Sequence, residues 1–256
     1  MLNEFDIIED FSAIELSQMD TIRLMDRIDT KYLTDVITMK KVLVRALDCG
    51  YLAFELSGRR IQEYRSMYYD TPSLQMYLDH HNRRLVRQKL RTRCYDTTGQ
   101  TFVELKSKNN HGRTKKKRLE IAPEKYWMAA MDDEVISQWL EEKMTYDRIG
   151  MAPSLETVFS RVTLVNPEKT ERSTIDFDLG FNNVRCGTSA NMGNLVIVEV
   201  KQDGSIPSKL REILLESRVK PIRISKYCIG TAMTDNGVKS SRFKQKMILI
   251  NKMKNR

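Results

Sequence analysis

The sequence lacks the residue patterns that mark several common classes of protein. Its four cysteines are scattered with no Cys-x-x-Cys spacing, so reduced, structural cysteines are expected instead of a zinc site or a disulfide framework. Histidine occurs only three times, and no Ser-His-Asp or Cys-His arrangement is indicated. No apolar run approaches the roughly 20 residues that a membrane-spanning helix needs. These absences point away from transmembrane proteins, disulfide-rich secreted domains and triad hydrolases.

The N-terminal segment and the composition indicate where such a chain would fold. The segment is acidic and has neither the basic stretch nor the apolar block of a signal peptide, so the expected location is cytoplasmic. With 41% hydrophobic and 30% charged residues, the composition is typical of a soluble globular protein. A chain of 256 residues can form one large domain or two small ones with a substantial core.

Positive charge is concentrated in one segment, residues 83–118. This segment holds 13 of the 43 Lys and Arg residues but only two of the 34 acidic residues, Asp96 and Glu104. It is therefore +11 by itself, more than the +9 of the whole chain. So high a charge cannot be buried in an ordinary core and must face water or an anionic ligand.

Side chains in this basic segment alternate as they do in β-strands. A strand over 87–93 places four cations on one face, and a strand over 103–108 gathers a carboxylate and two lysines on one face. Gly112 opens a third alternating stretch, so the three strands are expected to form an antiparallel meander. An open sheet of this kind would suit a nucleic-acid platform, whereas a closed barrel could point the cations inward around a chain of phosphates.

The rest of the chain predicts more strands and several helices. Further alternating runs occur at residues 27–33, 61–69, 157–165, 172–177 and 195–201. Together with the meander they give about eight strands, which favours an α+β fold with an antiparallel sheet and is about the number that closes a barrel. A helix is expected over 11–25, and a second helix, capped by Asp132, should cover the outside of the sheet.

Eight short motifs occur in a fixed order along most of the chain. They are Arg27-x-x-x-Lys31-Tyr32, Tyr69-Asp70-Thr71, Lys89-x-Arg91-x-Arg93, Glu104-x-Lys106, Phe159-x-Arg161, Ile175-Asp176, Val198-Glu199-Val200-Lys201 and Ile224-Ser225-Lys226-Tyr227. In this order they resemble the VTC domain, the polyphosphate polymerase domain of the vacuolar transporter chaperone proteins. That domain is a branch of the triphosphate tunnel metalloenzymes, or CYTH superfamily. The resemblance covers residues 23–233.

The resemblance implies an eight-stranded antiparallel β-barrel with outer helices, whose tunnel holds the phosphates of ATP together with Mn²⁺ or Mg²⁺. It also implies transfer of the terminal phosphate of ATP to a growing inorganic polyphosphate chain. Matched motif by motif, the catalytic residues are Lys31, Arg91, Arg93, Lys106 and Arg161, and the metal ligand is Glu199. Further phosphate- or nucleotide-binding residues are Lys117, Arg172, Lys201, Arg223, Ser225 and Lys226, with the register among Lys115, Lys116 and Lys117 left open.

Two other functions stay open. The tunnel hydrolases and cyclases carry Glu-x-Glu-x-Lys on the first strand, where this chain has Arg27-x-Asp29-x-Lys31. The VTC branch shares the loss of one carboxylate, but Asp29 keeps a metal-dependent triphosphatase as an alternative. The other alternative is a non-catalytic module that binds polyphosphate or another polyanion. No specific nucleic-acid partner is expected, since the basic segment offers only Tyr95 and Phe102 for base stacking.

The other carboxylates also have two interpretations. Asp176 and Glu104 either bind metal or orient neighbouring cations. In the strand over 61–69, a structural ion pair between Glu63 and Arg65 is favoured over a catalytic role.

The C-terminal end is predicted to be a separate element. A single domain is expected over residues 1–236, followed by a basic tail over 237–256. Residues 239–256 contain seven Lys or Arg and no acidic residue. An outer or frayed helix is the favoured interpretation, and contact with an anionic membrane surface or with polyphosphate is the alternative.

Overall fold

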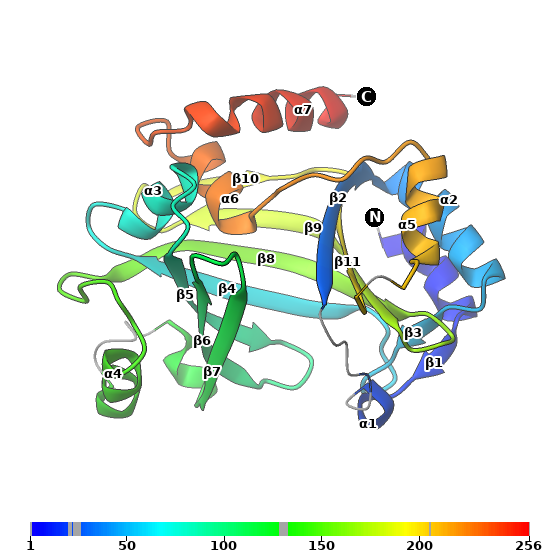
Figure 1. Ribbon diagram of the computed structural model, residues 1–256, viewed down its shortest axis with the longest axis horizontal. Helices are drawn as coiled ribbons and strands as arrows, with labels where there is room; N and C mark the ends of the chain where they lie inside the picture. The colour runs from blue at the N-terminus through cyan, green and yellow to red at the C-terminus, as the bar shows by residue number, and fades with distance from the viewer. Residues whose placement is uncertain (1, 20–21, 23–26, 128–132, 205, 256) are drawn as a thin grey trace.

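A strongly curved sheet of 11 strands forms the centre of the protein (Figure 1). The computed structural model describes residues 2–19, 22, 27–127, 133–204 and 206–255. Hydrogen-bonded neighbours follow one main path: β2 (Ile28–Asp35), β11 (Leu195–Gln202), β9 (Glu171–Asn183), β8 (Ala152–Val165), β4 (Gln62–Asp70), β5 (Arg87–Tyr95), β6 (Thr101–Lys108) and β7 (Thr114–Ile121). Three short strands, β1 (Ser12–Ile14), β3 (Leu52–Phe54) and β10 (Thr188–Asn191), are attached beside this path.

The sheet is open, which corrects the predicted closed eight-stranded barrel. All neighbours on the main path are antiparallel, so the predicted α+β class with an antiparallel sheet is confirmed. Within the described residues, no pairing joins the first and last strands of the path, β2 and β7. β7 is exposed along most of its length and carries four consecutive cations, residues 115–118. Charged side chains on an edge strand oppose pairing with another strand, which explains why β7 remains an edge.

The N-terminal segment differs from the helix expected over 11–25. It begins with η1 (Leu2–Asp10), continues into β1, which pairs in parallel with β3, and then forms a single turn, α1 (Leu16–Met19). Ile14 is fully buried at the strand pairing, so a contact distant in sequence overrides the local helical spacing. Met25, which belongs to the expected helical pattern, lies outside the described residues.

The second expected helix, α4 (Glu134–Glu141), follows η2 (Pro123–Tyr126). Its cap is Asp133, whose carboxylate accepts a hydrogen bond from the backbone N–H of Ile136 at 3.0 Å. Asp132, the predicted cap, lies outside the described residues. The helix packs through Ile136 and Leu140 against the cluster behind β5 and β6.

The alternation of side chains on β11 shows how the sheet separates a core from a polar surface. Val196, Val198 and Val200 are buried in a cluster with α2 (Val36–Asp48) and α5 (Lys209–Glu216), which lie on the outer, convex face. Glu199 and Lys201, which alternate with them, line a cavity on the concave face. The same strand therefore stabilises the fold on one side and supplies charged groups on the other.

One helix lies on the concave face rather than outside the sheet. α6 (Lys226–Thr234) packs beside α3 (Gln75–His81) at one end of the molecule, and its Tyr227 joins a buried cluster with Tyr68 and Ile197 (Figure 1). Gly230 permits this packing, because a Cβ there would lie 2.5 Å from a ring atom of Phe181. The N-terminus of α6 consequently reaches the cavity.

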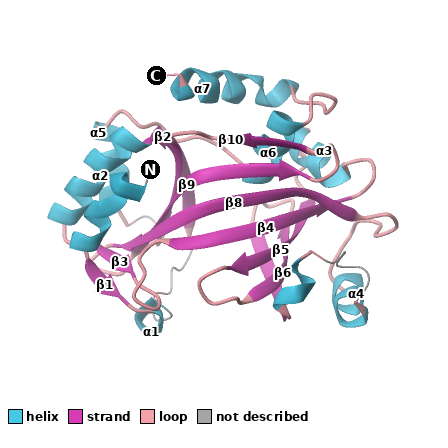
Figure 2. Ribbon diagram, turned by 180° about the vertical axis from the view of Figure 1, so that it is seen from behind, coloured by secondary structure: helices cyan, strands magenta, loops and turns pink. Residues whose placement is uncertain are grey.

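β8 and β9 are the longest strands, with 14 and 13 residues, and they run through the length of the molecule (Figure 2). One end of β8 contributes Val162 and Leu164 to the cluster under α2 and α5. Its other end contributes Leu155 and Phe159 to the cluster under α6. These two strands connect the two halves of the hydrophobic core.

The C-terminal residues form η3 (Ser241–Phe243) and α7 (Lys244–Lys254), an outer helix that packs on the fold. Phe243 and Ile250 are buried in the same cluster as Tyr77, whose hydroxyl donates to the carbonyl of Lys239 at 3.0 Å. Residues on both sides of the predicted 236/237 boundary thus contribute to one buried cluster. Among the described residues, no helix has both the length and the apolar character that crossing a membrane requires.

Candidate functional site

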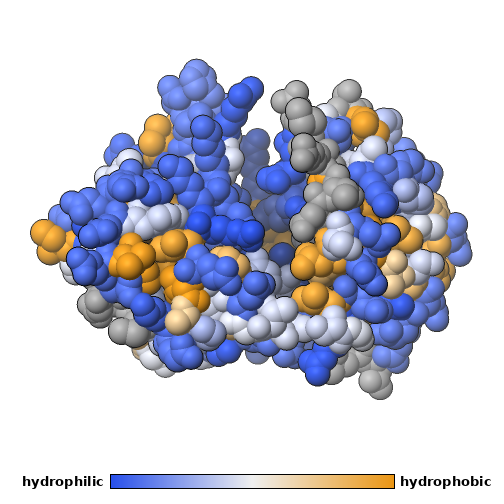
Figure 3. All heavy atoms as spheres, turned by 90° about the horizontal axis from the view of Figure 1, so that it is seen from below, coloured by the Kyte–Doolittle hydropathy of each residue, from blue (hydrophilic) through white to orange (hydrophobic). Residues whose placement is uncertain are grey.

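The concave face of the sheet forms a cavity of about 1070 Å³. All eight strands of the main path contribute side chains to its wall. Figure 3 shows it as a deep hollow with hydrophilic residues around it. Because strands alternate, the charged faces predicted for β5 and β6 point into this hollow while their apolar faces point to the core behind.

Most of the residues singled out from the sequence line this cavity. They are Lys31, Arg91, Arg93, Lys106, Arg161, Arg172, Glu199, Lys201, Ser225 and Lys226. These residues come from segments far apart in the chain, and the fold brings them to one surface.

Two predicted residues do not line the cavity. Lys117 lies opposite Leu105 on β6, so it shares the face that points away, whereas Lys116 lies opposite Lys106 and does line the wall. The structure therefore corrects the register from Lys117 to Lys116. Arg223 is exposed on the segment that precedes α6 and lies outside the wall.

Glu199 on β11 lies between two lysines, one on the same strand and one on the neighbouring strand β2. Its carboxylate is 3.7 Å from Nζ of Lys31 on β2 and 3.0 Å from Nζ of Lys201. Burial alone would raise the pKa of Glu199, but the charges of Lys31 and Lys201 outweigh it and hold the pKa well below its usual range. Glu199 is therefore ionised at neutral pH.

Glu104 holds two further cations and is itself only 2% exposed. It accepts a hydrogen bond from Nε of Arg91 at 2.8 Å and one from Nζ of Lys116 at 3.0 Å. Burial opposes ionisation, but Arg91, Arg93 and Lys116 lower the pKa of Glu104 below its usual value. Glu104 thus contacts one cation on each of the two strands beside its own, Arg91 on β5 and Lys116 on β7.

Asp176 is the third carboxylate that holds two cations. It accepts hydrogen bonds from Nε of Arg161 at 2.5 Å and from Nη2 of Arg161 at 2.8 Å, and its Oδ2 lies 2.7 Å from Nζ of Lys226. Despite burial, Arg161 and Lys226 lower the pKa of Asp176. The same ammonium lies over the ring of Phe159. Asp176 thus orients Arg161 on β8 and Lys226, the first residue of α6.

Several other cations in the wall have no acidic partner among the described residues. Lys89 donates to Ser225 Oγ at 2.8 Å, and Arg93 donates to Ser66 Oγ at 3.1 Å. In the part of the chain that the structure describes, the side chains of Lys106 and Arg172 take part in no ion pair or hydrogen bond. Burial, together with the charge of Lys31, lowers the pKa of Lys106 to about 8. An anionic ligand would relieve this repulsion.

Aromatic rings beneath the cations were not identified from the sequence. The guanidinium of Arg91 lies 5.7 Å from the ring centre of Tyr68, and that of Arg161 lies 4.9 Å from the ring centre of Tyr64. The ion pair expected between Glu63 and Arg65 is not formed, since Arg65 donates to Asp96 at 2.9 Å. The alternation of Tyr64 and Tyr68 was the signal that could have located this floor.

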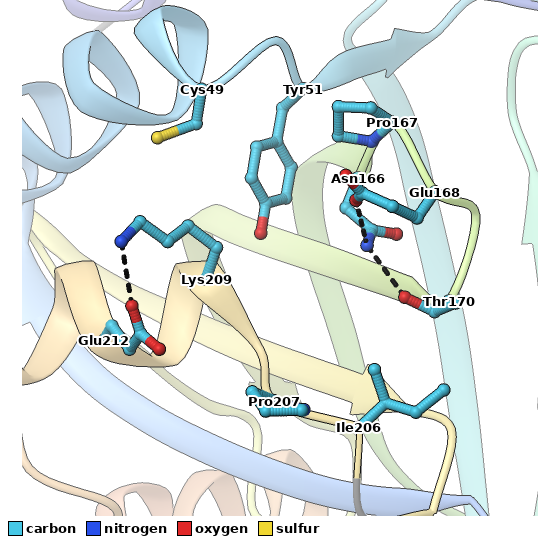
Figure 4. Close-up of a pocket in the computed structure, with 10 residues that line it drawn as sticks. All are labelled: Cys49, Tyr51, Asn166, Pro167, Glu168, Thr170, Ile206, Pro207, Lys209 and Glu212. Atoms are coloured by element: carbon cyan, nitrogen blue, oxygen red, sulfur yellow. Dashed lines mark hydrogen bonds and ion pairs between the residues drawn. The ribbon is translucent and has the colours of Figure 1, made fainter.

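A smaller pocket of about 490 Å³ lies on the outer side, beside α2 and α5 (Figure 4). It contains Tyr51 and an ion pair in which Lys209 donates to Glu212 at 2.8 Å. No residue singled out from the sequence as a site residue lines it. The concave cavity is therefore the candidate functional site.

Two solved structures share the fold across most of the chain. A putative adenylate cyclase from Bacillus halodurans is 16% identical, with a TM-score of 0.50, and the alignment covers 78% of this chain and 94% of that one. A putative adenylyl cyclase from Hippeastrum, described as having a dominant triphosphatase activity, is also 16% identical, with a TM-score of 0.51 and coverage of 80% and 95%. At this identity the likeness establishes the fold alone. None of the curated proteins matches the chain.

The chain shares the fold of these two structures and carries a cation-lined cavity on the concave face of its sheet. The family model of the VTC domain matches residues 26–234, which is most of the chain. The chain therefore belongs to the VTC domain family. The match ends at the last residue of α6, so α7 lies beyond it.

Proposed function

We propose that this protein is a polyphosphate polymerase that transfers the terminal phosphate of ATP to a growing inorganic polyphosphate chain. The observation that carries the proposal is the composition of the cavity wall. Three carboxylates hold six cations in place, and further cations remain without an acidic partner among the described residues. Such a wall suits a ligand with several phosphates in a row.

The proposed reaction needs charge neutralisation and alignment rather than a covalent nucleophile. The bond between the β- and γ-phosphates of ATP breaks, a bond forms from the γ-phosphorus to a terminal oxygen of the chain, and ADP leaves. Arg161 and Arg91 are held by buried carboxylates, so their guanidinium groups are oriented before substrate binds. Lys106, which has no such partner, is free to follow the transferring phosphate.

Glu199 is the residue that would hold the Mn²⁺ or Mg²⁺ that the family implies. In the described part of the chain, no group of three or more His, Cys, Asp or Glu side chains is arranged to hold a metal ion. One ionised carboxylate can hold a divalent cation that takes its remaining ligands from water and substrate phosphates, as Mg²⁺ commonly does. When bound, such a cation neutralises charge on the phosphates.

The contacts of Asp29 favour polymerisation over two-metal hydrolysis. Arg27 donates to both oxygens of Asp29, at 2.6 Å and 3.1 Å. A second metal would have to displace this guanidinium from the carboxylate. β2 therefore contributes Lys31 to the cavity, and its one carboxylate there, Asp29, is already paired with Arg27.

Incubation of the protein with ATP and either Mn²⁺ or Mg²⁺ tests the proposal. We expect long polyphosphate on a stained gel and release of ADP. Lys40→Ala, an exposed change on the outer face of α2, should behave like the unmodified protein. Release of free phosphate without a chain would identify a triphosphatase, and binding of polyphosphate without turnover would identify a non-catalytic module.

The low pKa of Lys106 predicts a pH dependence of phosphate binding. Lys106 is charged below its pKa of about 8 and neutral above it, so binding should weaken as pH rises. Relative to a Lys106→Arg variant, which stays charged, the affinity for metal-free tripolyphosphate should fall about tenfold between pH 7 and pH 9. Titration calorimetry at each pH measures the affinity of both proteins for tripolyphosphate. Because ionisation of the ligand affects both affinities equally, it cancels in their ratio. Parallel pH profiles would contradict a role for Lys106 in binding.

A further inference from the structure

One motif of the sequence, Tyr69-Asp70-Thr71, lies at the end of β4 and outside the cavity wall. Asp70, its central residue, is only 2% exposed. Its carboxylate accepts hydrogen bonds from the backbone N–H group of Thr71 at 2.8 Å and from those of Met76 and Tyr77 at 2.9 Å. The last two belong to the first turn of α3. Asp70 therefore supplies the side-chain cap that the N-cap residue of α3 does not provide.

The same carboxylate also holds α6. The hydroxyl of Tyr227, which lies 157 residues further along the chain, donates to Oδ2 of Asp70 at 2.5 Å. Both side chains are buried, and burial raises the pKa of each. Tyr227 therefore keeps its proton and is the donor. A buried carboxylate without a cationic partner destabilises the fold unless hydrogen bonds compensate, so the contact with Tyr227 helps to keep Asp70 in this place.

The first turn of α6 carries the groups of this helix that reach the cavity. Ser225 caps the helix and accepts a hydrogen bond from Nζ of Lys89 at 2.8 Å. Lys226 follows, with its Nζ 2.7 Å from Asp176. All four residues line the cavity, where a bound phosphate can compete for both ammonium groups. These two contacts are therefore not sufficient to hold the turn once a ligand is present.

The contact between Tyr227 and Asp70 lies behind the cavity wall, since neither residue lines it. The ring of Tyr227 also stacks on Tyr68, with ring centres 4.9 Å apart, and the hydroxyl of Tyr68 accepts from Arg91 at 3.0 Å. Residues 217–225, which precede α6, contain no helix or strand of the named elements. Side-chain contacts, rather than a neighbouring regular element, therefore determine where α6 begins.

We propose that Asp70 is a positioning residue for phosphate binding, which acts through the hydroxyl of Tyr227 to hold Ser225 and Lys226 toward the phosphates. This inference rests on the proposed function, because it explains how the same site is kept in place. Asp70 does not contact the ligand itself, since it lies outside the cavity wall. Its carboxylate joins β4, α3 and α6 at one point. Loss of one hydrogen bond there releases the turn without removing any cation.

Tyr227→Phe removes this hydrogen bond and keeps the ring. The fold should survive, because phenylalanine retains the stacking on Tyr68 and Asp70 retains its bonds to α3. We expect the affinity for metal-free tripolyphosphate, measured by titration calorimetry, to fall about tenfold. The control is Tyr77→Phe, which removes a buried hydroxyl from the same cluster, one that donates to the carbonyl of Lys239 at 3.0 Å. This control keeps the backbone N–H that Asp70 binds and should leave the affinity unchanged.

A double-mutant cycle with Lys226→Met tests whether Tyr227 acts through the first turn of α6. In the Lys226→Met background, Tyr227→Phe should lower the affinity by less than about threefold, because the cation that it positions is already absent. The Lys226→Met change leaves Asp176 paired with Arg161. An equal loss of affinity with and without Lys226 would overturn the inference.

Hydrogen exchange of the unmodified protein gives a test that needs no variant. The amide of Ile229 donates to the carbonyl of Ser225 at 2.9 Å in the first turn of α6. If the contact of Tyr227 with Asp70 holds this turn in advance, the amide should exchange slowly both with and without tripolyphosphate. Protection that arises only when tripolyphosphate is added would overturn the inference.

The remaining outcomes separate this inference from the proposed function. An unchanged affinity in Tyr227→Phe would show that Asp70 only caps α3, and equal losses in Tyr227→Phe and Tyr77→Phe would show a general loosening of the cluster. Either result would overturn the positioning role whether or not the protein makes polyphosphate. A selective loss of affinity in a protein that makes no polyphosphate would overturn the proposed function alone. If the unmodified protein does not bind tripolyphosphate, both fall.

Discussion

Replacing Lys106 with alanine is expected to lower polyphosphate synthesis by about a hundredfold or more, since it removes a cation that stabilises negative charge on the transferring phosphate. The midpoint of thermal unfolding of the Lys106→Ala variant should not fall, because the Lys106 side chain lies in the cavity and pairs with no carboxylate among the described residues. Initial rates with ATP and a thermal melt measure the two effects on the same preparation.

Arg91→Ala is the matched comparison for this result. It should reduce turnover to a similar extent, but it also removes one of the two cations that donate hydrogen bonds to buried Glu104. Breaking a buried pair by removing one partner costs about 3 kcal/mol. The two variants should therefore agree in activity and differ in stability. Normal turnover in both would exclude these residues from the chemistry, and equal stability would show that Glu104 does not depend on Arg91.

Glu199→Gln is expected to abolish metal-dependent turnover while strengthening the binding of metal-free tripolyphosphate. The amide removes a hard, charged oxygen of the kind that Mg²⁺ and Mn²⁺ prefer. It also frees Lys31 and Lys201 from the carboxylate that they face at 3.7 Å and 3.0 Å. Turnover and binding should therefore change in opposite directions, which a general loss of structure would not produce.

Calorimetry without metal and a rate assay with Mn²⁺ or Mg²⁺ separate these two effects. Glu212→Gln, on exposed α5, removes the same charge outside the cavity and serves as the control. Retained turnover with an unchanged metal requirement would remove Glu199 as the metal ligand. Weaker binding of tripolyphosphate would show that Glu199 organises the lysines instead of competing with the ligand.

The charged faces of β5, β6 and β11 could be predicted from the sequence because charged residues recur there at every second position. Residues 115–118 are all cations, so alternation could not show which of them face the cavity. That register is set by pairing, which places Lys116 opposite Lys106. The partners of Arg161 and Lys226 could not be inferred for a similar reason. Lys226 and Asp176 are distant in sequence and meet only because α6 packs on the concave face.

Closure of the sheet was beyond what strand counting can show. The number of strands on the main path agrees with the resemblance, but pairing between β2 and β7 depends on the charge and exposure of the edge. The segment over 11–25 shows the same limit. Its apolar spacing is compatible with a helix, and only the parallel pairing of β1 with β3 determines that Ser12–Ile14 is a strand.

The length of β8 and β9 has a consequence for how the protein unfolds. Each strand contributes to the hydrophobic clusters at both ends of the molecule, through Val162 and Leu155 on β8 and through Ile175 and Phe181 on β9. Neither cluster can be exposed to water without disrupting strands that also support the other. The two halves therefore form one cooperative unit, in which the central amides of β8 and β9 exchange with solvent only when the whole domain opens.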